Sequence, residues 1–219
     1  MKFKYVLFDL DGTITNSAAG ITNSVAYALK KLGVPVPPYS DLLKFIGPPL
    51  FTAFKEFCGF NDEKAKSAVE FYREYYPEKG IFECRLYDNI KSVLEALNKN
   101  GLKIILATSK PEVFADRIIE HFGLKKYFYY IAGASFDKSR SEKPQVISYA
   151  LSACGITDKG SAVMVGDRHH DIIGAHENKI ASIGVLYGFG TREELESSGA
   201  DYIAKTPEEI LKIIITKSV

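Results

Sequence analysis

The sequence of 219 residues predicts an α/β protein with a doubly wound parallel sheet and a small helical domain inserted after the first strand. Short apolar segments alternate along the chain with segments of helical periodicity, which is typical of a parallel sheet with crossover helices. The apolar segments are nearly continuous, as is typical of strands covered on both faces. The exception is one long interval, residues 16–85, in which the patterns are helical.

Six segments rich in β-branched and apolar residues are expected to be strands. They are Lys4–Leu10, Leu102–Thr108, Tyr127–Gly133, Ser161–Gly166, Ala181–Tyr187 and Asp201–Ala204. Segments with apolar positions at helical spacing separate these strands or follow them. The expected helices are Asn89–Asn100, Glu112–Phe122, Pro144–Cys154, Asp171–Asn178, Arg192–Ser198 and Pro207–Lys217.

The inserted interval has its own helical segments, separated by prolines and a glycine. They are Ile21–Leu32, Leu42–Ile46, Leu50–Phe57 and Glu63–Tyr76. The interval divides the chain into a core of residues 1–15 and 86–219 and a second domain of residues 16–85. Its position after the first strand favours a cap over the carboxyl end of that strand, where ligands bind in open α/β sheets. The alternative is that it only covers a hydrophobic face.

The composition is that of a globular protein, with 46% hydrophobic and 25% charged residues. Because 28 basic residues nearly balance 27 acidic ones, neither a nucleic acid polymer nor a membrane is expected as the partner. The three cysteines, at positions 58, 84 and 154, form no metal-binding or disulfide pattern, so we expect a cytoplasmic protein. No pattern predicts an oligomeric state.

Two carboxylates end the first expected strand. Asp9 and Asp11 are separated by one residue and are followed by Gly12 and Thr13. Acids at a buried strand end need a cation, hydrogen-bond donors or water, because burial of an unpaired charge is costly. Acids before a glycine also form ordinary turns. The spacing differs, however, from that of an EF-hand calcium loop.

Polar residues also follow the later strands. Thr108 and Ser109 end the second strand, Lys143 begins a helix, and Asp167 and Asp171 follow the fourth strand. Hydroxyls, amides and an ammonium group are suitable donors to phosphate oxygens. Taken singly, these residues could be a helix N-cap, a solvated lysine and first-turn acids. Their order, each at a strand end, favours one phosphate-binding site.

The segments DLDGT, ILATS, Lys143-Pro144 and VGDRHHD together resemble the four motifs of the haloacid dehalogenase superfamily. The resemblance extends over essentially the whole chain, and the helical insert is similar to the C1-type cap of that superfamily. It implies a Rossmannoid core whose cap closes on a substrate. The implied activity is hydrolysis of a phosphate monoester.

The resemblance implies a role for each motif residue. Asp9 would be the nucleophile that forms an aspartyl-phosphate, and Asp11 would protonate the leaving group and then deprotonate water. Thr108 and Lys143 would stabilise the phosphoryl oxygens. The presence of an acid at position 11 argues against a dehalogenase or a phosphonate-cleaving enzyme.

The implied cofactor is Mg²⁺. It would be held by the carboxylate of Asp9, the backbone carbonyl of Asp11 and the carboxylate of Asp167. Asp171 would instead orient water or Lys143.

The substrate is expected to be a small phosphorylated metabolite. The implied substrate-binding residues are Gly12, Thr13, Ser109, Gly47 and Arg140. For Gly47 the alternative is a corner between helices, and for Arg140 it is an exposed loop position. The segment 135–143 resembles bacterial 5′-nucleotidases, and the wider resemblance is to phosphoglycolate phosphatases. The expected substrate is therefore a nucleoside 5′-monophosphate or phosphoglycolate.

Two other functions stay open. A sugar phosphomutase of the same superfamily is disfavoured, because residues 45–50 lack the arginine-serine pair of the mutase cap loop. A binding or regulatory protein without catalysis is disfavoured, because Asp9 and Asp11 are both present.

Overall fold

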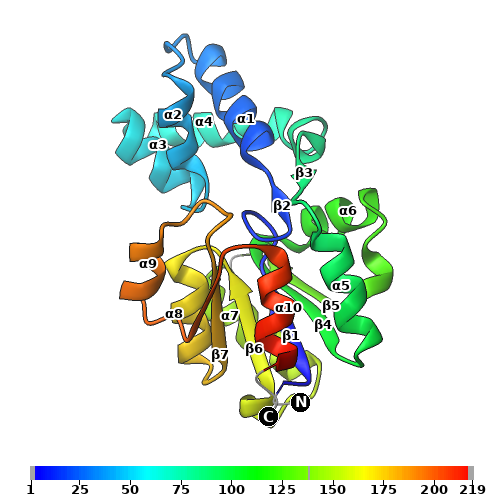
Figure 1. Cartoon of the computed structure of the whole chain (residues 1–219). Helices are drawn as coiled ribbons and strands as arrows, with labels where there is room; N and C mark the ends of the chain where they lie inside the picture. The colour runs from blue at the N-terminus through cyan, green and yellow to red at the C-terminus, as the bar shows by residue number, and fades with distance from the viewer. Residues whose placement is uncertain (1–2, 138, 217–219) are drawn as a thin grey trace. The chain divides into compact units, whose positions relative to one another are not determined.

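The computed structural model describes residues 3–137 and 139–216, and within these limits it contains a six-stranded parallel sheet in the order β5-β4-β1-β6-β7-β8 (Figure 1). The strands are β1 (Tyr5–Phe8), β4 (Lys103–Pro111), β5 (Phe128–Ala134), β6 (Ala162–Gly166), β7 (Ala181–Val185) and β8 (Tyr202–Ala204). The order reverses at β1, which pairs with β4 on one side and with β6 on the other. The predicted fold class is confirmed.

The helices of the core follow the strands as predicted, with ends that differ by a few residues. They are α5 (Ile90–Lys99), α6 (Glu112–His121), α7 (Lys143–Ala153), α8 (His169–Glu177), α9 (Arg192–Ser197) and α10 (Pro207–Thr216). Short 3-10 turns occur at Lys125–Tyr127 and Lys159–Ser161. Lys217, the predicted end of the last helix, and Lys138, in the segment that resembles 5′-nucleotidases, lie outside the described residues.

The nearly continuous apolar strands are explained by helices on both faces of the sheet. Leu7, Ile105 and Met164 are fully buried in a cluster that includes residues of α7 and α8. Helices α5 and α10 pack against each other on the opposite face (Figure 1). The adjacent residues Val6 and Phe8 of β1 are also fully buried. The sheet therefore has no solvated face at its centre, and polar side chains are found at its ends.

Strand β4 is longer than predicted. The sequence predicted its end at Thr108, because apolar residues stop after Ala107. The strand runs on to Pro111, which pairs with Ala134 of β5, and the register shifts between Ala107 and Pro111. Such an irregularity turns side chains away from the regular alternation of a strand. This end of β4 holds three residues of the site described below.

Residues 16–85 form a separate compact unit. Its elements are α1 (Ala18–Lys31), α2 (Tyr39–Leu42), the 3-10 turn η1 (Leu43–Phe45), α3 (Leu50–Cys58), α4 (Asp62–Tyr75) and the 3-10 turn η2 (Gly80–Phe82). The chain enters the unit in β2 (Thr15–Asn16) and leaves it in β3 (Arg85–Leu86), which pair as a two-stranded sheet. The side chain of Asn61 caps α4 by accepting a hydrogen bond from Lys64 N.

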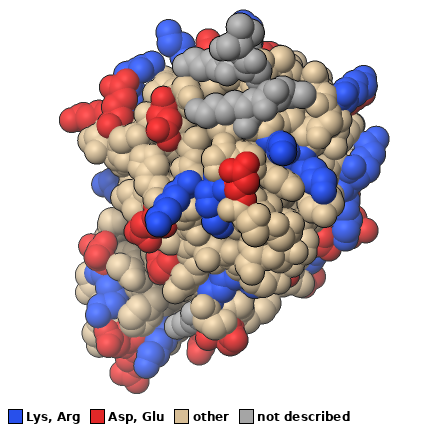
Figure 2. All heavy atoms as spheres, turned by 90° about the horizontal axis from the view of Figure 1, so that it is seen from below, with Lys and Arg blue, Asp and Glu red and all other residues tan. Residues whose placement is uncertain are grey.

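The surface carries charges of both signs. On the face shown in Figure 2, Lys and Arg are interspersed with Asp and Glu, in agreement with the near balance of charges in the sequence. None of the helices in the described part of the chain is both long and apolar enough to span a bilayer.

Candidate active site

Three carboxylates gather at the carboxyl end of the sheet. Asp9 directly follows β1, where its N–H donates to Val165 O of β6 at 2.9 Å. Asp167 directly follows β6, and Asp171 lies in the first turn of α8. One oxygen from each carboxylate lies within 4.8 Å of the others. The carboxyl ends of neighbouring parallel strands meet at one edge, so residues more than 150 positions apart become neighbours.

Lys143 joins two of these carboxylates. Its Nζ lies 2.7 Å from Asp9 Oδ1 and 2.8 Å from Asp171 Oδ1. It also donates to the carbonyl oxygen of Ala107 at 3.2 Å. The side chain is only 4% exposed, and the residue begins α7 with Pro144 in the first turn, where proline is well tolerated. The lysine is therefore fixed beside the predicted nucleophile.

The electrostatics of the cluster are those of crowded negative charge. Burial raises the pKa of Asp9 to about 6, against the opposing effect of Lys143 and with a further rise from Asp171. Burial and the nearby Asp171 and Asp9 carboxylates raise the pKa of Asp167 well above its usual value. Burial alone would lower the pKa of Lys143, but the carboxylates of Asp171 and Asp9 raise it. The cluster needs more positive charge than one lysine supplies.

Asp167 is held by groups from two loops. Phe189 N–H donates to its Oδ2 at 2.8 Å, and the Thr13 hydroxyl donates to its Oδ1 at 3.4 Å. Gly12 and Gly188 lie so close that a Cβ on either would clash with the Asp167 side chain. The sequence predicted Gly12 and Thr13 as substrate-binding residues, and the structure places both against Asp167. It did not predict Gly188 or Phe189, which belong to a loop after β7.

The irregular end of β4 brings three further polar residues to the same edge. Thr108 is 2% exposed, and its hydrogen bond to Asp9 lowers the pKa of that carboxyl, against the larger effect of burial. Ser109 is exposed. Lys110 Nζ lies 2.6 Å from Asp11 Oδ2. Lys110 was not predicted, although it follows the Thr108-Ser109 pair that drew attention to this strand.

Comparison with known proteins identifies the family. The family model described as haloacid dehalogenase-like hydrolase matches residues 6–185. The chain belongs to this hydrolase family. The match includes each of the strand ends described above. The resemblance stated from the four motifs is confirmed.

Relatives of this hydrolase carry several names. A 5′-nucleotidase of Pseudomonas aeruginosa is 42% identical over 197 residues, which are 90% of this chain and 89% of that protein. The tyrosine-protein kinase PtkA of Mycobacterium tuberculosis is 38% identical over 206 residues, which are 94% of this chain and 67% of that protein. A phosphoglycolate phosphatase of Vibrio parahaemolyticus is 26% identical over 219 residues, 96% of each chain.

Among solved structures, a predicted phosphatase from Clostridium acetobutylicum matches this hydrolase with a TM-score of 0.92 and 47% identity. The match covers 99% of this chain and 100% of that one. Together with the phosphatase-named relatives, this shows that the chain is a phosphatase of the haloacid dehalogenase-like family.

A network beside the cluster fixes the loop that carries Asp167. Glu194 of α9 accepts hydrogen bonds from Arg168 Nε at 2.8 Å and from His169 N at 2.9 Å, and it lies 2.7 Å from His169 Nδ1. Arg168 N–H donates to Asp171 Oδ2 at 3.1 Å. The loop between β6 and α8 is therefore held from both sides. Glu194 was not predicted as a residue of the site.

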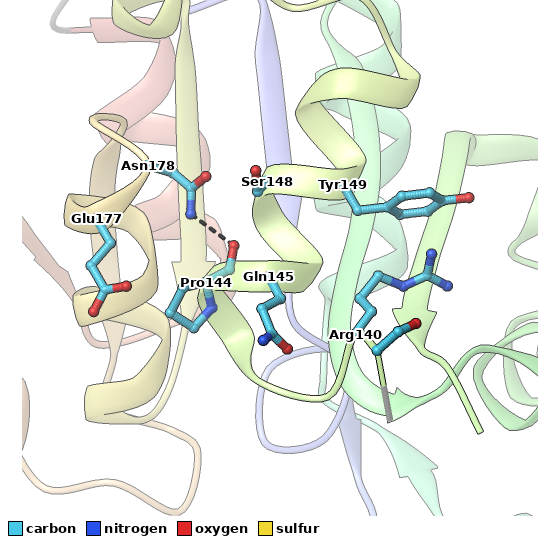
Figure 3. Close-up of a pocket in the computed structure, with 8 residues that line it drawn as sticks. Arg140, Pro144, Gln145, Ser148, Tyr149, Glu177 and Asn178 are labelled. Carbon is cyan, nitrogen blue, oxygen red and sulfur yellow. Dashed lines mark hydrogen bonds between the residues drawn. The ribbon is translucent and has the colours of Figure 1, made fainter. Parts of the chain in front are cut away.

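Arg140 makes its contacts outside the carboxylate cluster. Arg140 Nη2 donates to Glu112 Oε2 at 2.8 Å, and Nε donates to Gly133 O at 2.7 Å. Its guanidinium also lies 3.7 Å from the ring centroid of Tyr149, beside an open hollow of about 620 Å³ (Figure 3). These contacts, and not the carboxylate cluster, hold Arg140. Gly47 belongs to the unit of residues 16–85, where it has a φ of 109°.

The residues present fit a divalent cation with oxygen ligands. The candidate donors of the cluster are carboxylate oxygens, and hard cations such as Mg²⁺ prefer such ligands to imidazole or thiolate. Burial and then the acidic neighbours raise the pKa of Asp167, so a cation beside this carboxylate would favour its charged form. Lys143 contacts one oxygen of Asp9 and one of Asp171, whereas Asp167 accepts hydrogen bonds from Phe189 N–H and from the Thr13 hydroxyl.

Proposed function

We propose that this phosphatase hydrolyses a small phosphate monoester in two displacements, with Asp9 as the nucleophile and Asp11 as the proton-transfer residue. One observation carries the proposal. The carboxylates of Asp9 and Asp167 lie at two strand ends within 4.8 Å of each other, and Lys143 Nζ lies 2.7 Å from Asp9. This arrangement places a lysine, and carboxylates able to share a divalent cation, beside the nucleophile, which suits attack on a phosphate dianion.

In the first displacement, a carboxylate oxygen of Asp9 attacks phosphorus and the bond from phosphorus to the ester oxygen breaks. Asp11 gives a proton to the departing oxygen. Lys143 and Thr108, both buried beside Asp9, stabilise the charge on the phosphoryl oxygens. The products are a free alcohol and an aspartyl-phosphate at Asp9.

In the second displacement, Asp11 takes a proton from water as the water attacks phosphorus. The bond from phosphorus to Asp9 breaks, which restores the carboxylate and releases inorganic phosphate. Asp11 thus ends the cycle in the protonated state in which it began. Gly12, in the loop after β1, and Ser109, near the end of β4, are proposed to lie beside the phosphate, to which the Ser109 hydroxyl would donate.

Mg²⁺ is the proposed cofactor, held by the carboxylates of Asp9 and Asp167 and by the backbone carbonyl of Asp11. When bound, it supplies positive charge that offsets both the carboxylates and the substrate dianion. Asp171, which is 1% exposed and pairs with Lys143, is proposed to orient that lysine.

The first experiment measures phosphate release from p-nitrophenyl phosphate with and without Mg²⁺. The wild type is expected to turn over only with Mg²⁺, and Asp9→Asn is expected to lose at least about 1,000-fold in kcat, since it lacks the nucleophile. Asp116→Asn is the matched control, because Asp116 of α6 forms an exposed ion pair with Lys125. Turnover that survives in Asp9→Asn would contradict the proposal.

The proposed substrate is a nucleoside 5′-monophosphate, with phosphoglycolate second. The relative named 5′-nucleotidase is 42% identical, against 26% for the one named phosphoglycolate phosphatase. Residues 16–85 are the proposed cap, with Gly47 and Arg140 as proposed substrate contacts. A panel of nucleoside monophosphates, phosphoglycolate and sugar phosphates, compared by kcat/KM, tests this order. A preference for a sugar phosphate would contradict it.

The proposed location is the cytoplasm. Cys58, Cys84 and Cys154 form no disulfide within the residues that the structure describes, which is compatible with a reducing compartment. Fractionation of cells that produce the native protein would test this proposal.

A further inference from the structure

Lys110 is nearly as buried as Lys143, with a side chain that is only 6% exposed. Lysines are almost never this buried unless they are paired. Lys110 pairs with Asp11, whose side chain is 20% exposed, at a distance of 2.6 Å between Nζ and Oδ2. A charged hydrogen bond of this length is a strong one.

The backbone conformation at the end of β4 directs the Lys110 side chain towards Asp11. Between Ala107 and Pro111 the register of β4 against β5 shifts, so residues 108–110 leave the regular alternation. The Lys110 N–H donates to the Thr108 hydroxyl at 3.3 Å, which links the two residues within this irregular stretch. The irregular strand end thus places the Lys110 ammonium on Asp11, across the gap between β4 and the loop after β1.

The two carboxylate oxygens of Asp11 differ in their hydrogen bonding. Oδ2 is engaged by Lys110. Oδ1 is buried and accepts no hydrogen bond from residues 3–137 or 139–216. Lys110 therefore anchors one oxygen of Asp11 and so restricts the orientation of the whole carboxyl group.

The two buried lysines of the site serve different carboxylates. Lys143 contacts Asp9 and Asp171, and Lys110 contacts Asp11. Each reactive acid of the proposed mechanism therefore has its own lysine. The orientation of a reacting group strongly affects the catalytic rate, since a displacement of about 1 Å can lower that rate about a hundredfold.

We propose that Lys110 is a positioning residue that holds Asp11 in the orientation required for proton transfer to the leaving group and from water. The inference rests on the proposed function, because it concerns the residue assigned to proton transfer. Lys110 acts on proton transfer through its contact with Asp11, and this role requires no contact between Lys110 and the substrate.

The test compares two substrates that differ in their need for proton transfer. The p-nitrophenolate group leaves without protonation, whereas the alkoxide of a nucleoside 5′-monophosphate requires it. The rate of alcohol release in a single turnover reports the first displacement alone, whereas the second displacement uses Asp11 in the same way for both substrates. Lys110→Met is expected to lower this single-turnover rate about 10- to 100-fold for the nucleotide and less than about threefold for p-nitrophenyl phosphate, with KM nearly unchanged. Lys110→Arg, which keeps a cation near Asp11, is expected to recover most of the loss.

A double-mutant cycle provides the decisive readout. If Lys110 acts through Asp11, then Lys110→Met adds no further loss when Asp11 is already Asn. The comparison of Asp11→Asn with Asp11→Asn/Lys110→Met also holds if Lys110→Met alone is too unstable, since the double variant leaves no unpaired buried charge. Lys103→Met is the matched control, because Lys103 lies exposed at the other end of β4.

The outcomes separate this inference from the function on which it rests. Equal losses of the single-turnover rate of alcohol release for both substrates, additive effects of the two substitutions, or a rise in KM alone would each overturn the positioning role. A wild type that hydrolyses neither substrate would instead contradict the proposed function. A non-additive pair with a loss confined to the nucleotide would support both.

Discussion

At the scale of single residues, the site depends on how closely the chain approaches the Asp167 carboxylate. Gly12 has a φ of 87°, and a Cβ at this position would clash with that carboxylate. We expect Gly12→Ala to lower the free energy of unfolding by about 3 kcal/mol, from backbone strain plus displacement of Asp167. We also expect it to weaken Mg²⁺ binding at least about tenfold. Urea unfolding and calorimetric titration with Mg²⁺ measure the two effects.

The control for Gly12→Ala is Gly101→Ala. Gly101 has a similar φ of 78°, but an added Cβ would meet nothing within 4 Å. This control should cost only the strain of the left-handed backbone, about 1–2 kcal/mol, with Mg²⁺ affinity unchanged. Equal effects of the two substitutions would mean that close packing on Asp167 is not important.

Which residues of the site could be predicted follows from their position along the strands. Asp9 and Asp167 directly follow apolar strands, so their convergence was predictable from the sequence. The contribution of Lys110 was not predictable, because the direction of its side chain depends on a register shift in β4 that the residue types do not indicate. Phe189 contributes its backbone N–H, a group common to all residues except proline, so its role could not be inferred from residue type.

At the scale of elements, α9 stabilises the loop before α8 through Glu194. Partial burial would raise the pKa of Glu194, but the hydrogen bonds from His169 N–H and Arg168 lower it to about 2 from an ordinary 4.5. A carboxyl whose pKa is lowered by folding stabilises the protein above its unfolded pKa, and this stabilisation is lost as pH falls through the folded pKa.

The effect of Glu194→Gln on the free energy of unfolding should therefore depend on pH. The substitution should lower the free energy of unfolding by about 1–2 kcal/mol at neutral pH, because it removes charged hydrogen bonds. The difference from wild type should shrink as pH falls from 4.5 towards 2. Urea unfolding at several pH values measures it. Glu196→Gln, which removes an exposed pair with Arg192, should change stability by less than about 0.5 kcal/mol. A difference for Glu194→Gln that is constant with pH would contradict the role of charge.

The elements themselves were largely predictable, because a buried parallel sheet leaves a strong pattern. The predicted strand Ala181–Tyr187 is two residues longer than β7, since Leu186 and Tyr187 are apolar but already belong to the following loop. The predicted helix Asp171–Asn178 began two residues late, because His169 and His170 did not look like helix-starting residues. Polar residues at element ends are where periodicity is least informative.

At the scale of the whole molecule, the balanced total charge hides a strong local imbalance. The chain has 28 basic and 27 acidic residues, yet Asp9, Asp167 and Asp171 share one buried cluster with a single lysine. Buried like charges oppose folding unless a cation joins them. Global stability should therefore be linked to the concentration of divalent cations, and the link should pass through these carboxylates.

This linkage predicts that the wild type and Asp167→Asn exchange their order of stability when Mg²⁺ is added. For the wild type, Mg²⁺ at about 100 times its dissociation constant should raise the free energy of unfolding by about 2.7 kcal/mol, because the ion binds the folded chain alone. Asp167→Asn removes one of the repelling charges, so with a chelator it should be at least as stable as the wild type. With Mg²⁺ the variant should gain little and become the less stable protein. Thermal unfolding at both conditions tests the order. The wild type could instead be more stable than Asp167→Asn by the same margin with chelator and with Mg²⁺. The carboxylates would then not be the cation site, because an ion bound to Asp167 makes the order of the two stabilities depend on Mg²⁺.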